Sequence, residues 1–449
     1  MFFINFVLMK KFPAIIFTAV VFCPSAAMAQ LSLPSGLPAV KIDAAASTGL
    51  DGGIYVLPST QGVELRYSSS SPVNWQRFSN LGAAYAEDIS DVRHEGNDWI
   101  VTLGGDDTGL VVTVAGISHY YWFVNYANHR LELQSLGFAA EQDCDRTSLQ
   151  PVGQGDRILY YTINGRPEEL SREIEIEYTT LRYDENSAQY QPVVTSVQIP
   201  YLQSVVAVEA PLCDTDFRMS GDRFLREWDQ LQQVTSDRWQ TIAVAAETTA
   251  VQTERDVPNE QKDSDGLGGS APCEITFTAV VSDAAMYREW QISDDPEFGI
   301  VDYSYNELQI EHTFREQGTH YVRFIADNAE GRCEYIGQTY EVFVGESALR
   351  CPNAFTPFTS PGVNDEWRVS YKSLIDYECH IFNKWGTELF NTTDPAIGWD
   401  GKYGGKYVPA GTYYYVIRAE GSDGKQYKLS GDINIIGYHG NSSTAADGE

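Results

Sequence analysis

Short apolar runs separated by turns of Gly, Pro, Asn and Asp repeat along the chain from Gly52 onward. The runs are rich in Val, Ile, Tyr, Phe and Trp, a composition that favours β-strands. Up to residue 143, their spacing is typical of an immunoglobulin-like sandwich. The expected strands are Ile54–Leu57, Val63–Tyr67, Trp75–Phe78, Trp99–Leu103, Leu110–Val114, Tyr120–Val124 and Leu131–Leu136, within a first domain of residues 30–143.

The aromatic run Tyr120–Phe123 has two interpretations. Adjacent exposed rings would form a platform for carbohydrate. In a strand, however, successive side chains point to opposite faces, so the run is expected to alternate between the core and the outer face of a sheet.

A second β-sandwich is predicted over residues 144–247. Arg157–Ile163 has the composition of a strand, and Asn164-Gly165 after it is a strong hairpin-turn signal. Apolar residues at helical spacing after Ser220 predict a short helix, with a continuous strand as the alternative. Arg238–Val244 is expected to be the last strand of this module.

Strict alternation in Glu173–Tyr178 places three carboxylates on one face of a strand. Such a row can form a metal or catalytic cluster. No His or Asp stands at ligand spacing beside it, so a solvated sheet face is the favoured interpretation.

Residues 248–271 are polar, charged and rich in Gly, and are therefore expected to form a linker. Asp263-Ser-Asp265-Gly266 resembles half of a calcium loop. It lacks the downstream bidentate Glu that such a loop requires, so we assign it to the linker.

Residues 272–346 predict a third sandwich. Phe314–Val322 resembles the turn-then-strand signature of the polycystic-kidney-disease (PKD) type of immunoglobulin-like domain, and Trp290 resembles its core Trp. Domains of that type act as spacers or weak binding modules. The expected frame consists of Ile275–Val280, Glu289–Ile292 and His320–Ile325.

The pattern over residues 347–437 predicts a small all-β sandwich. Trp399-Asp400-Gly401 is a turn with an aromatic anchor, because Asp bonds its own backbone and Gly supplies positive φ. Pro409-Ala410-Gly411 is a second turn, and Thr412–Ile417 after it is a strong strand signal. The chain then ends in a tail, residues 438–449, that is expected to be flexible.

Six blocks of this C-terminal domain resemble, in order, the gliding motility-associated C-terminal domain. That domain is the type B sorting signal of the type IX (Por) secretion system of Bacteroidota. The residues that carry the resemblance are Asn353, Phe355, Pro357, Asn364, Asp365, Asn383, Lys384, Trp385, Gly386, Trp399, Asp400, Gly401, Pro409, Gly411, Tyr413 and Gly431.

Two positions depart from the family pattern. Phe358–Gly362 replaces the usual Asn-Gly-Asp-Gly, so a cation site in this loop is in question, and Lys384 replaces an Arg. The resemblance implies delivery to the type IX translocon and the outer-membrane sorting machinery. It also implies recognition of a folded surface. Turn residues set the shape of that surface, and Trp399 is expected to pack under the Asp400-Gly401 turn. The connection Gly345–Arg350 is expected to make few contacts.

The net charge of −31 argues against nucleic-acid binding through a basic patch. Lys10-Lys11, an apolar run and Ala27-Met28-Ala29 predict a signal peptide over residues 1–29, removed before Gln30. No later run reaches the roughly 20 apolar residues of a membrane span. The protein is therefore expected to be exported by Sec and to have no transmembrane segment.

Six cysteines follow the signal peptide, and an even number in an exported protein indicates disulfides. We expect Cys273 to pair with Cys333, and Cys144 with Cys213. Cys351 and Cys379 are paired partly by elimination. No two of these cysteines have Cys-x-x-Cys spacing, which argues against a structural zinc ion.

No phosphate loop, dinucleotide fingerprint, Gly-x-Ser-x-Gly elbow or His-Glu-x-x-His motif occurs in the sequence. We therefore expect a non-enzymatic protein without a cofactor or metal. The predicted fold is a tandem of immunoglobulin-like sandwiches ending in the sorting domain. The first three modules would bind a surface glycan or protein, at the cell surface or in the medium.

Two alternatives come from other functional classes. A PorA-like component of the system would relay a signal in the envelope and would lie on its periplasmic side. A glycan-active surface enzyme is the other alternative, since carboxylate pairs cannot be recognised from spacing alone.

Overall fold

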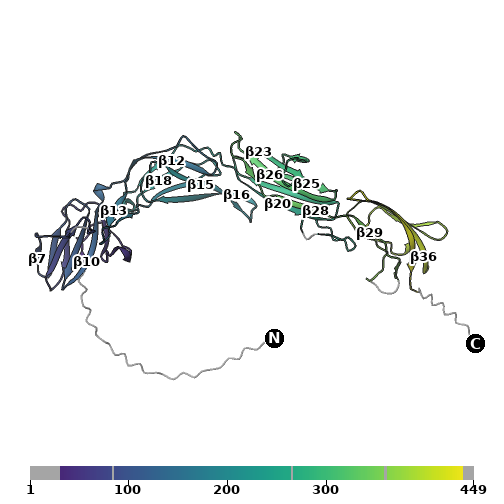
Figure 1. Cartoon of the computed structure of the whole chain (residues 1–449), viewed down its shortest axis with the longest axis horizontal. Helices are drawn as coiled ribbons and strands as arrows, with labels where there is room; N and C mark the ends of the chain where they lie inside the picture. The colour runs from purple at the N-terminus through teal and green to yellow at the C-terminus, as the bar shows by residue number, and fades with distance from the viewer. Residues whose placement is uncertain (1–30, 83–84, 264–265, 358–361, 438–449) are drawn as a thin grey trace, which may run out of the picture.

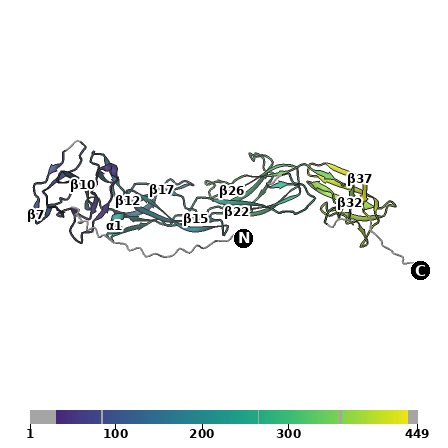
Figure 2. The ribbon, with the colours of Figure 1, turned by 90° about the horizontal axis from the view of Figure 1, so that it is seen from below.

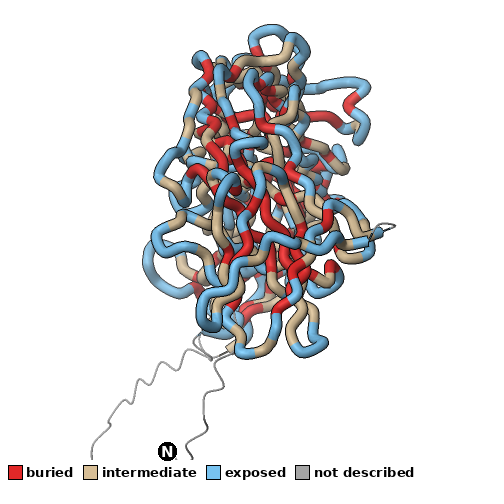
Figure 3. Tube along the Cα trace, turned by 90° about the vertical axis from the view of Figure 1, so that its left-hand side faces the viewer, coloured by how far each residue is buried: buried red, intermediate tan, exposed pale blue. Residues whose placement is uncertain are grey.

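The computed structural model describes residues 31–82, 85–263, 266–357 and 362–437. They form four β-domains arranged end to end, which we number 1 to 4 from the N-terminal end (Figures 1 and 2). Viewed from the domain 1 end, buried positions lie inside the column and exposed ones outside (Figure 3). The predicted all-β class of tandem sandwiches is confirmed. The expected signal peptide and C-terminal tail lie outside the described residues.

Domain 1 packs two sheets around Trp75, Tyr67 and Phe123. Six of the seven strands predicted for it are present, and Phe123 of the aromatic run is buried in this core. One sheet contains β1 (Leu31–Ser32), β4 (Glu64–Ser68), β8 (Asp98–Thr102) and β7 (Arg93–Glu95). The other contains β2 (Val40–Ile42), β3 (Gly53–Leu57), β10 (Ile117–Asn125), β9 (Thr108–Val114), β5 (Val73–Phe78) and β6 (Glu87–Asp88).

Domain 2 begins earlier than predicted, because the seventh expected strand, β11 (Glu132–Phe138), pairs with β12 (Arg146–Gln154) and not with domain 1. The helix expected after Ser220 is present as α1 (Arg223–Glu227). Arg238–Val244 is not a strand. The remaining strands are β17 (Val206–Glu209) beside β12, and a second sheet of β16 (Gln189–Ile199), β15 (Ile174–Asp184), β18 (Arg218–Gly221) and β19 (Gln232–Thr235).

The three aligned carboxylates of domain 2 each face an arginine. Glu173 pairs with Arg223, Glu175 with Arg226 and Glu177 with Arg218, while Ile174 and Ile176 on the opposite face are buried. No group of three or more His, Cys, Asp or Glu side chains suited to a metal occurs among the described residues. The row is therefore a charge-paired outer face.

Domains 1 and 2 share one hydrophobic core. The hairpin of β13 (Ile158–Tyr161) and β14 (Pro167–Leu170) turns at Asn164-Gly165, as predicted, and lies against domain 1. The Tyr161 ring lies 5.7 Å from the Trp122 ring of β10. At the same joint, Arg172 and Asp222 form a fully buried ion pair, 2.8 Å from Nε to Oδ2. The two domains are thus joined as one packed unit.

Domain 3 encloses Trp290, which is fully buried as predicted. One sheet contains β20 (Ala246–Gln252), β22 (Cys273–Val281) and β25 (Gln309–Phe314). The other contains β21 (Gly268–Gly269), β28 (Tyr340–Val344), β26 (Gly318–Asp327), β23 (Tyr287–Ser293) and β24 (Tyr303–Tyr305), with β27 (Tyr335–Ile336) beside β26.

The linker predicted over residues 248–271 is not a linker. Most of its first part belongs to β20, which pairs with β22 from Ala246 to Gln252. Its small and polar residues gave no strand signal, because every second position of β20 faces outward.

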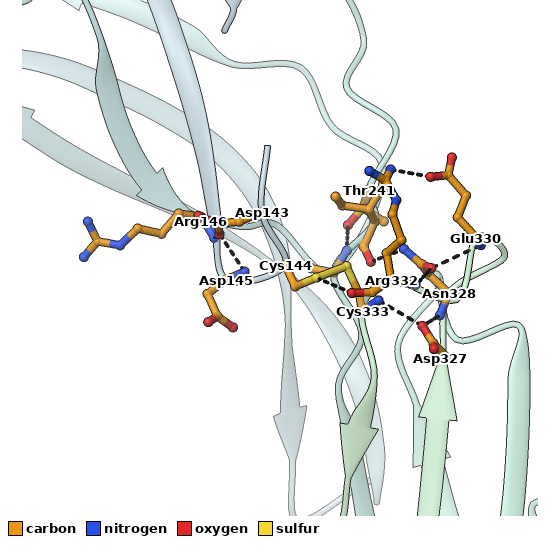
Figure 4. The surroundings of a disulfide bond; sticks show 12 residues. Asp143, Cys144, Asp145, Arg146, Thr241, Asp327, Asn328, Glu330, Arg332 and Cys333 are labelled. Carbon is orange, nitrogen blue, oxygen red and sulfur yellow. Dashed lines mark hydrogen bonds and ion pairs between the residues drawn. A yellow bond between two sulfur atoms is a disulfide. The ribbon is translucent and has the colours of Figure 1, made fainter. Parts of the chain in front are cut away.

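Cys144 forms a disulfide with Cys333, and this bond joins domain 2 to domain 3 (Figure 4). The pairing of Cys273 with Cys333 is therefore wrong, because the two lie at opposite ends of domain 3. Cys273 starts β22 opposite Phe314, whereas Cys333 follows the far end of β26. The pairing of Cys144 with Cys213 is also wrong, since the Cys213 Sγ faces the Thr179 carbonyl.

Two further contacts brace the joint between domains 2 and 3. Asn328 of domain 3 donates its side-chain N–H to the Ile242 carbonyl, 3.2 Å away. The long β15–β16 hairpin reaches over the joint, where β16 contacts β22. Burial, followed by the Glu247 carboxylate, raises the pKa of Tyr190 on this hairpin. The joint is thus held by a covalent bond and by packing.

Peptide mapping without reductant should recover Cys144 and Cys333 in one cross-linked peptide. Cys213, Cys273 and Cys379 are buried and unpaired among the described residues, so they should react with a thiol reagent only after unfolding. Reduction should leave each domain folded but broaden the range of angles between domains 2 and 3, as measured by small-angle scattering. A cross-linked peptide containing Cys273 would contradict the pairing.

Domain 4 is built on one five-stranded sheet of β30 (Ala354–Phe355), β37 (Gln426–Ile435), β36 (Gly411–Gly421), β32 (Leu374–Phe382) and β33 (Glu388–Thr392). Two small sheets accompany it. They pair β29 (Ala348–Arg350) with β31 (Ser370–Lys372), and β34 (Lys402–Tyr403) with β35 (Lys406–Tyr407).

Residues 253–263 of domain 3, here called the strap, lie against domain 4. Tyr371 exchanges backbone hydrogen bonds with Asn259 and Gln261, and the Asn259 side chain donates to the Val369 and Pro395 carbonyls. Val257 packs against the core of domain 4. The second half of the predicted linker is thus an interdomain contact.

The connection Gly345–Arg350 also makes more contacts than predicted. Ser347 bonds the Asp423 carboxylate and the Tyr427 hydroxyl, and the Gly345 carbonyl accepts from Ser422. Domains 3 and 4 therefore meet over an extended polar and apolar interface.

Candidate functional site

The candidate site lies on domain 4, where the motif residues form two groups. The first group is the internal frame. Trp399 is only 1% exposed, and its ring lies between Phe355 and Tyr413, at centroid distances of 5.6 and 5.3 Å. Its Nε1–H donates to the Lys402 carbonyl at 3.0 Å. This tryptophan is the anchor of the frame.

The turn above Trp399 is closed by Asp400, whose carboxylate accepts from the Lys402 backbone N–H at 3.0 Å. Gly401 has φ of +74°, and an added Cβ would lie 3.2–3.4 Å from the side chains of Pro357 and Phe355. The next turn is held by Tyr413, whose hydroxyl donates to the Pro409 carbonyl at 2.7 Å. The prediction that Trp399 packs under the Asp400-Gly401 turn agrees with these contacts.

The second group is exposed and begins with the turn from Asn383 to Gly386. The Asn383 side-chain oxygen accepts from the backbone N–H groups of Trp385 and Thr387, both at 2.9 Å. Gly386 has φ of +83°, a conformation that disfavours a side chain. The turn projects Trp385 outward, 78% exposed, with Lys384 Nζ 4.6 Å from the centre of its ring. An indole held in water by a rigid turn is a typical anchor for a partner.

A groove of about 370 Å³ runs between this turn and the start of β36. It brings together two sequence blocks that lie more than twenty residues apart, and its residues are defined here as the groove: Asn383–Trp385, Thr387, Leu389, Tyr403 and Val408–Tyr413. Six of the predicted motif residues, Asn383, Lys384, Trp385, Pro409, Gly411 and Tyr413, therefore meet on one surface. The other six, Thr387, Leu389, Tyr403, Val408, Ala410 and Thr412, were not predicted.

The other motif residues lie away from the groove. The Asn353 and Asn364 carbonyls accept from the backbone N–H groups of Asn434 and Thr356, both at 2.9 Å. Asp365 accepts from the Gly362 N–H. Gly431 leaves room for the Tyr415 ring, since an added Cβ would lie 2.7 Å from the hydroxyl oxygen. These four residues shape the backbone of domain 4.

Cys351 and Cys379 are both free thiols, so the pairing predicted for them is not formed. Burial raises the pKa of Cys379 to about 11, and burial also raises the pKa of Cys351. Both thiols therefore stay protonated near neutral pH and are poor nucleophiles.

The comparisons with known families bear on domains 2 and 4. Residues 349–435 match the model of the CHU_C type IX secretion signal domain. Domain 4 is a type IX secretion signal domain. Residues 137–236 match a fibronectin type III domain, which agrees with the shift of the start of domain 2 to β11. No curated protein matches the chain.

Several solved structures resemble the chain at low identity. One is the tetra-tandem repeat in the extending region of a large adhesion protein, with 11% identity, 84% of this chain and 96% of that one covered, and a TM-score of 0.20. The chicken CNTN1 FN1–FN3 domains have 13% identity, 68% and 98% coverage, and a TM-score of 0.23. The three N-terminal domains of the bacteriophage RB49 Hoc protein have 12% identity, 69% and 100% coverage, and a TM-score of 0.20. None of these likenesses bears on function.

The secretion signal domain thus carries its family motif as a frame and as an open groove. Among the described residues, no helix is both long and apolar enough to cross a membrane.

Proposed function

We propose that this chain is a non-enzymatic cargo of the type IX system, exported by Sec and then delivered to the cell surface or the medium. The secretion signal domain over residues 349–435 is the observation that carries the proposal. In this function, domains 1 to 3 form a stiff stalk that holds a binding surface for a glycan or protein away from its point of attachment.

The joints of the molecule support the stalk. Domains 1 and 2 share a core, a disulfide joins domains 2 and 3, and the strap joins domains 3 and 4. Relative domain motion is the usual behaviour of chains with small interdomain contacts. Here specific contacts hold each pair of neighbouring domains together, and the domains lie end to end (Figure 1). Such a shape suits a spacer better than it suits a hinged enzyme.

A gain-of-function experiment tests the delivery step. A fluorescent reporter would be fused between residues 1–29 and residues 246–449 and expressed in a bacterium with a type IX system. The fusion includes domain 3 because the strap contributes to the core of the secretion signal domain. We expect the reporter to become accessible to protease on intact cells.

The control fusion replaces residues 246–449 with residues 31–245, and its reporter should stay in the periplasm. Periplasmic retention of both fusions would reject the cargo function. Retention of the full chain at the periplasmic face, while the reporter fusion is delivered, would instead favour the envelope-relay function.

A further inference from the structure

The groove of the secretion signal domain is lined mainly by apolar surface. Trp385 and Tyr403 line it with 78% and 53% of their surface exposed, and Leu389, Val408 and Ala410 also belong to its lining. Exposed aromatic side chains beside a concave apolar surface mark interaction sites, because burying them on binding releases water. A partner must therefore supply at least one apolar side chain.

Three side chains of the groove use polar groups within the domain itself. The Asn383 side-chain oxygen holds its own turn, the Tyr413 hydroxyl donates to Pro409, and the Thr412 hydroxyl donates to Asn434 at 2.9 Å. Recognition of a sugar needs free polar groups that fix its hydroxyls. Those three groups are occupied, and the surface that the groove exposes is mainly apolar, which favours a peptide over a glycan.

The one charged side chain among the residues defined as the groove is a lysine, although the whole chain has a net charge of −31. Lys384 lines the groove, and Lys406 lies opposite Tyr403 in the β34–β35 hairpin. Within the described part of the chain neither lysine forms an ion pair. Complementary charge steers a partner and fixes its orientation, so this rim selects for carboxylates.

We propose that the groove binds an acidic, apolar-bearing peptide segment of a protein of the type IX machinery. The apolar side chain of that segment packs against Trp385, and its carboxylates approach Lys384 and Lys406. This inference rests on the proposed function and adds the chemistry of the partner to it.

Surface delivery of the full chain in a type IX host tests the groove. Trp385→Ala removes the aromatic anchor, Lys384→Glu reverses the rim charge, and Lys384→Arg keeps it. The matched controls are Tyr414→Ala, an exposed ring of β36 outside the groove, and Lys428→Glu, an exposed lysine of β37. All four positions have exposed side chains, so thermal unfolding should be unchanged in all five variants.

We expect Trp385→Ala and Lys384→Glu each to lower the protease-accessible fraction at least about tenfold, the effect of losing a central anchor. Lys384→Arg and both controls should stay within about twofold of the unmodified chain. Normal delivery of either Trp385→Ala or Lys384→Glu, with the fold intact, would overturn the proposal.

A binding experiment distinguishes the glycan alternative. In the full chain labelled with 5-fluorotryptophan, the ¹⁹F signal of Trp385 is assigned by its loss in Trp385→Phe. Surface polysaccharide purified from the host should leave this signal in place. A shift that saturates with polysaccharide would make the groove a glycan site and overturn the proposal.

The experiments distinguish a wrong assignment of the groove from a wrong proposed function. If the reporter fusion with residues 246–449 is delivered but the groove variants behave normally, the domain is a signal recognised elsewhere on its surface. If that fusion is not delivered, the proposed function itself is rejected.

Discussion

Replacing Trp399 by Ala should strongly destabilise the secretion signal domain and abolish surface delivery. The side chain is almost fully buried, contacts two aromatic rings and donates a hydrogen bond to Lys402. Truncating a buried Trp costs about 3–5 kcal/mol. A domain of this size has a total stability of roughly 5–15 kcal/mol, so the loss is a large share of it.

Hydrogen exchange followed by mass spectrometry measures this change domain by domain. Peptides from β32 and β36 should lose protection in Trp399→Ala, while peptides from domains 1 and 2 should keep it. Trp385→Ala is the informative comparison, because it removes an exposed Trp from the same domain. A stable but undelivered Trp385→Ala beside a destabilised Trp399→Ala would separate recognition from folding. Full protection of the domain in Trp399→Ala would contradict the expectation.

Replacing Asp222 by Ala should destabilise domains 1 and 2 together by about 3–5 kcal/mol, the usual cost of leaving one buried charge unpaired. Asp222 accepts from Arg172 and from the Tyr126 hydroxyl, and it caps α1 through the Leu225 N–H. Burial, followed by the Asp222 carboxylate, raises the pKa of Tyr126. Without Asp222, the partners left to the Arg172 guanidinium among the described residues are uncharged: the His129 and Asp156 carbonyls and the Tyr126 hydroxyl.

Urea unfolding of the full chain, with domain-resolved hydrogen exchange, checks this result. Loss of protection should reach β10 in domain 1 as well as β15 in domain 2, because both strands contribute to one core. The double variant Arg172→Met with Asp222→Leu removes both charges and should recover much of the loss. Separate unfolding of the two domains in Asp222→Ala would show that the core is not shared energetically.

The strands were predictable because their alternation reports which face is buried. Glu173–Tyr178 is the clearest case, and β15 follows it with Ile174 and Ile176 inside. Domain boundaries were less predictable, because a strand such as β11 carries no mark of the sheet that it joins. Strand β20 was missed for a different reason, because its sequence is polar although its pairing with β22 is regular. The disulfide could not be predicted from cysteine spacing or from pairing within one domain, because Cys144 and Cys333 belong to different domains.

The site was partly predictable for a related reason. Turn residues such as Asn383 and Gly386 are recognisable because only a few residue types satisfy their backbone geometry. Leu389 and Tyr403, which complete the groove, have no such constraint. Their part in the surface depends on how the β34–β35 hairpin folds beside β33, and no local pattern encodes that approach.

The strap has a consequence for quality control during secretion. Val257 of domain 3 packs against the core of the secretion signal domain, and the Asn259 side chain donates hydrogen bonds to two of its carbonyls. If domain 3 has not folded, the strap is not held in position, and the secretion signal domain lacks the contacts that the strap makes with it. Recognition of the secretion signal domain would then depend on the folding of domain 3.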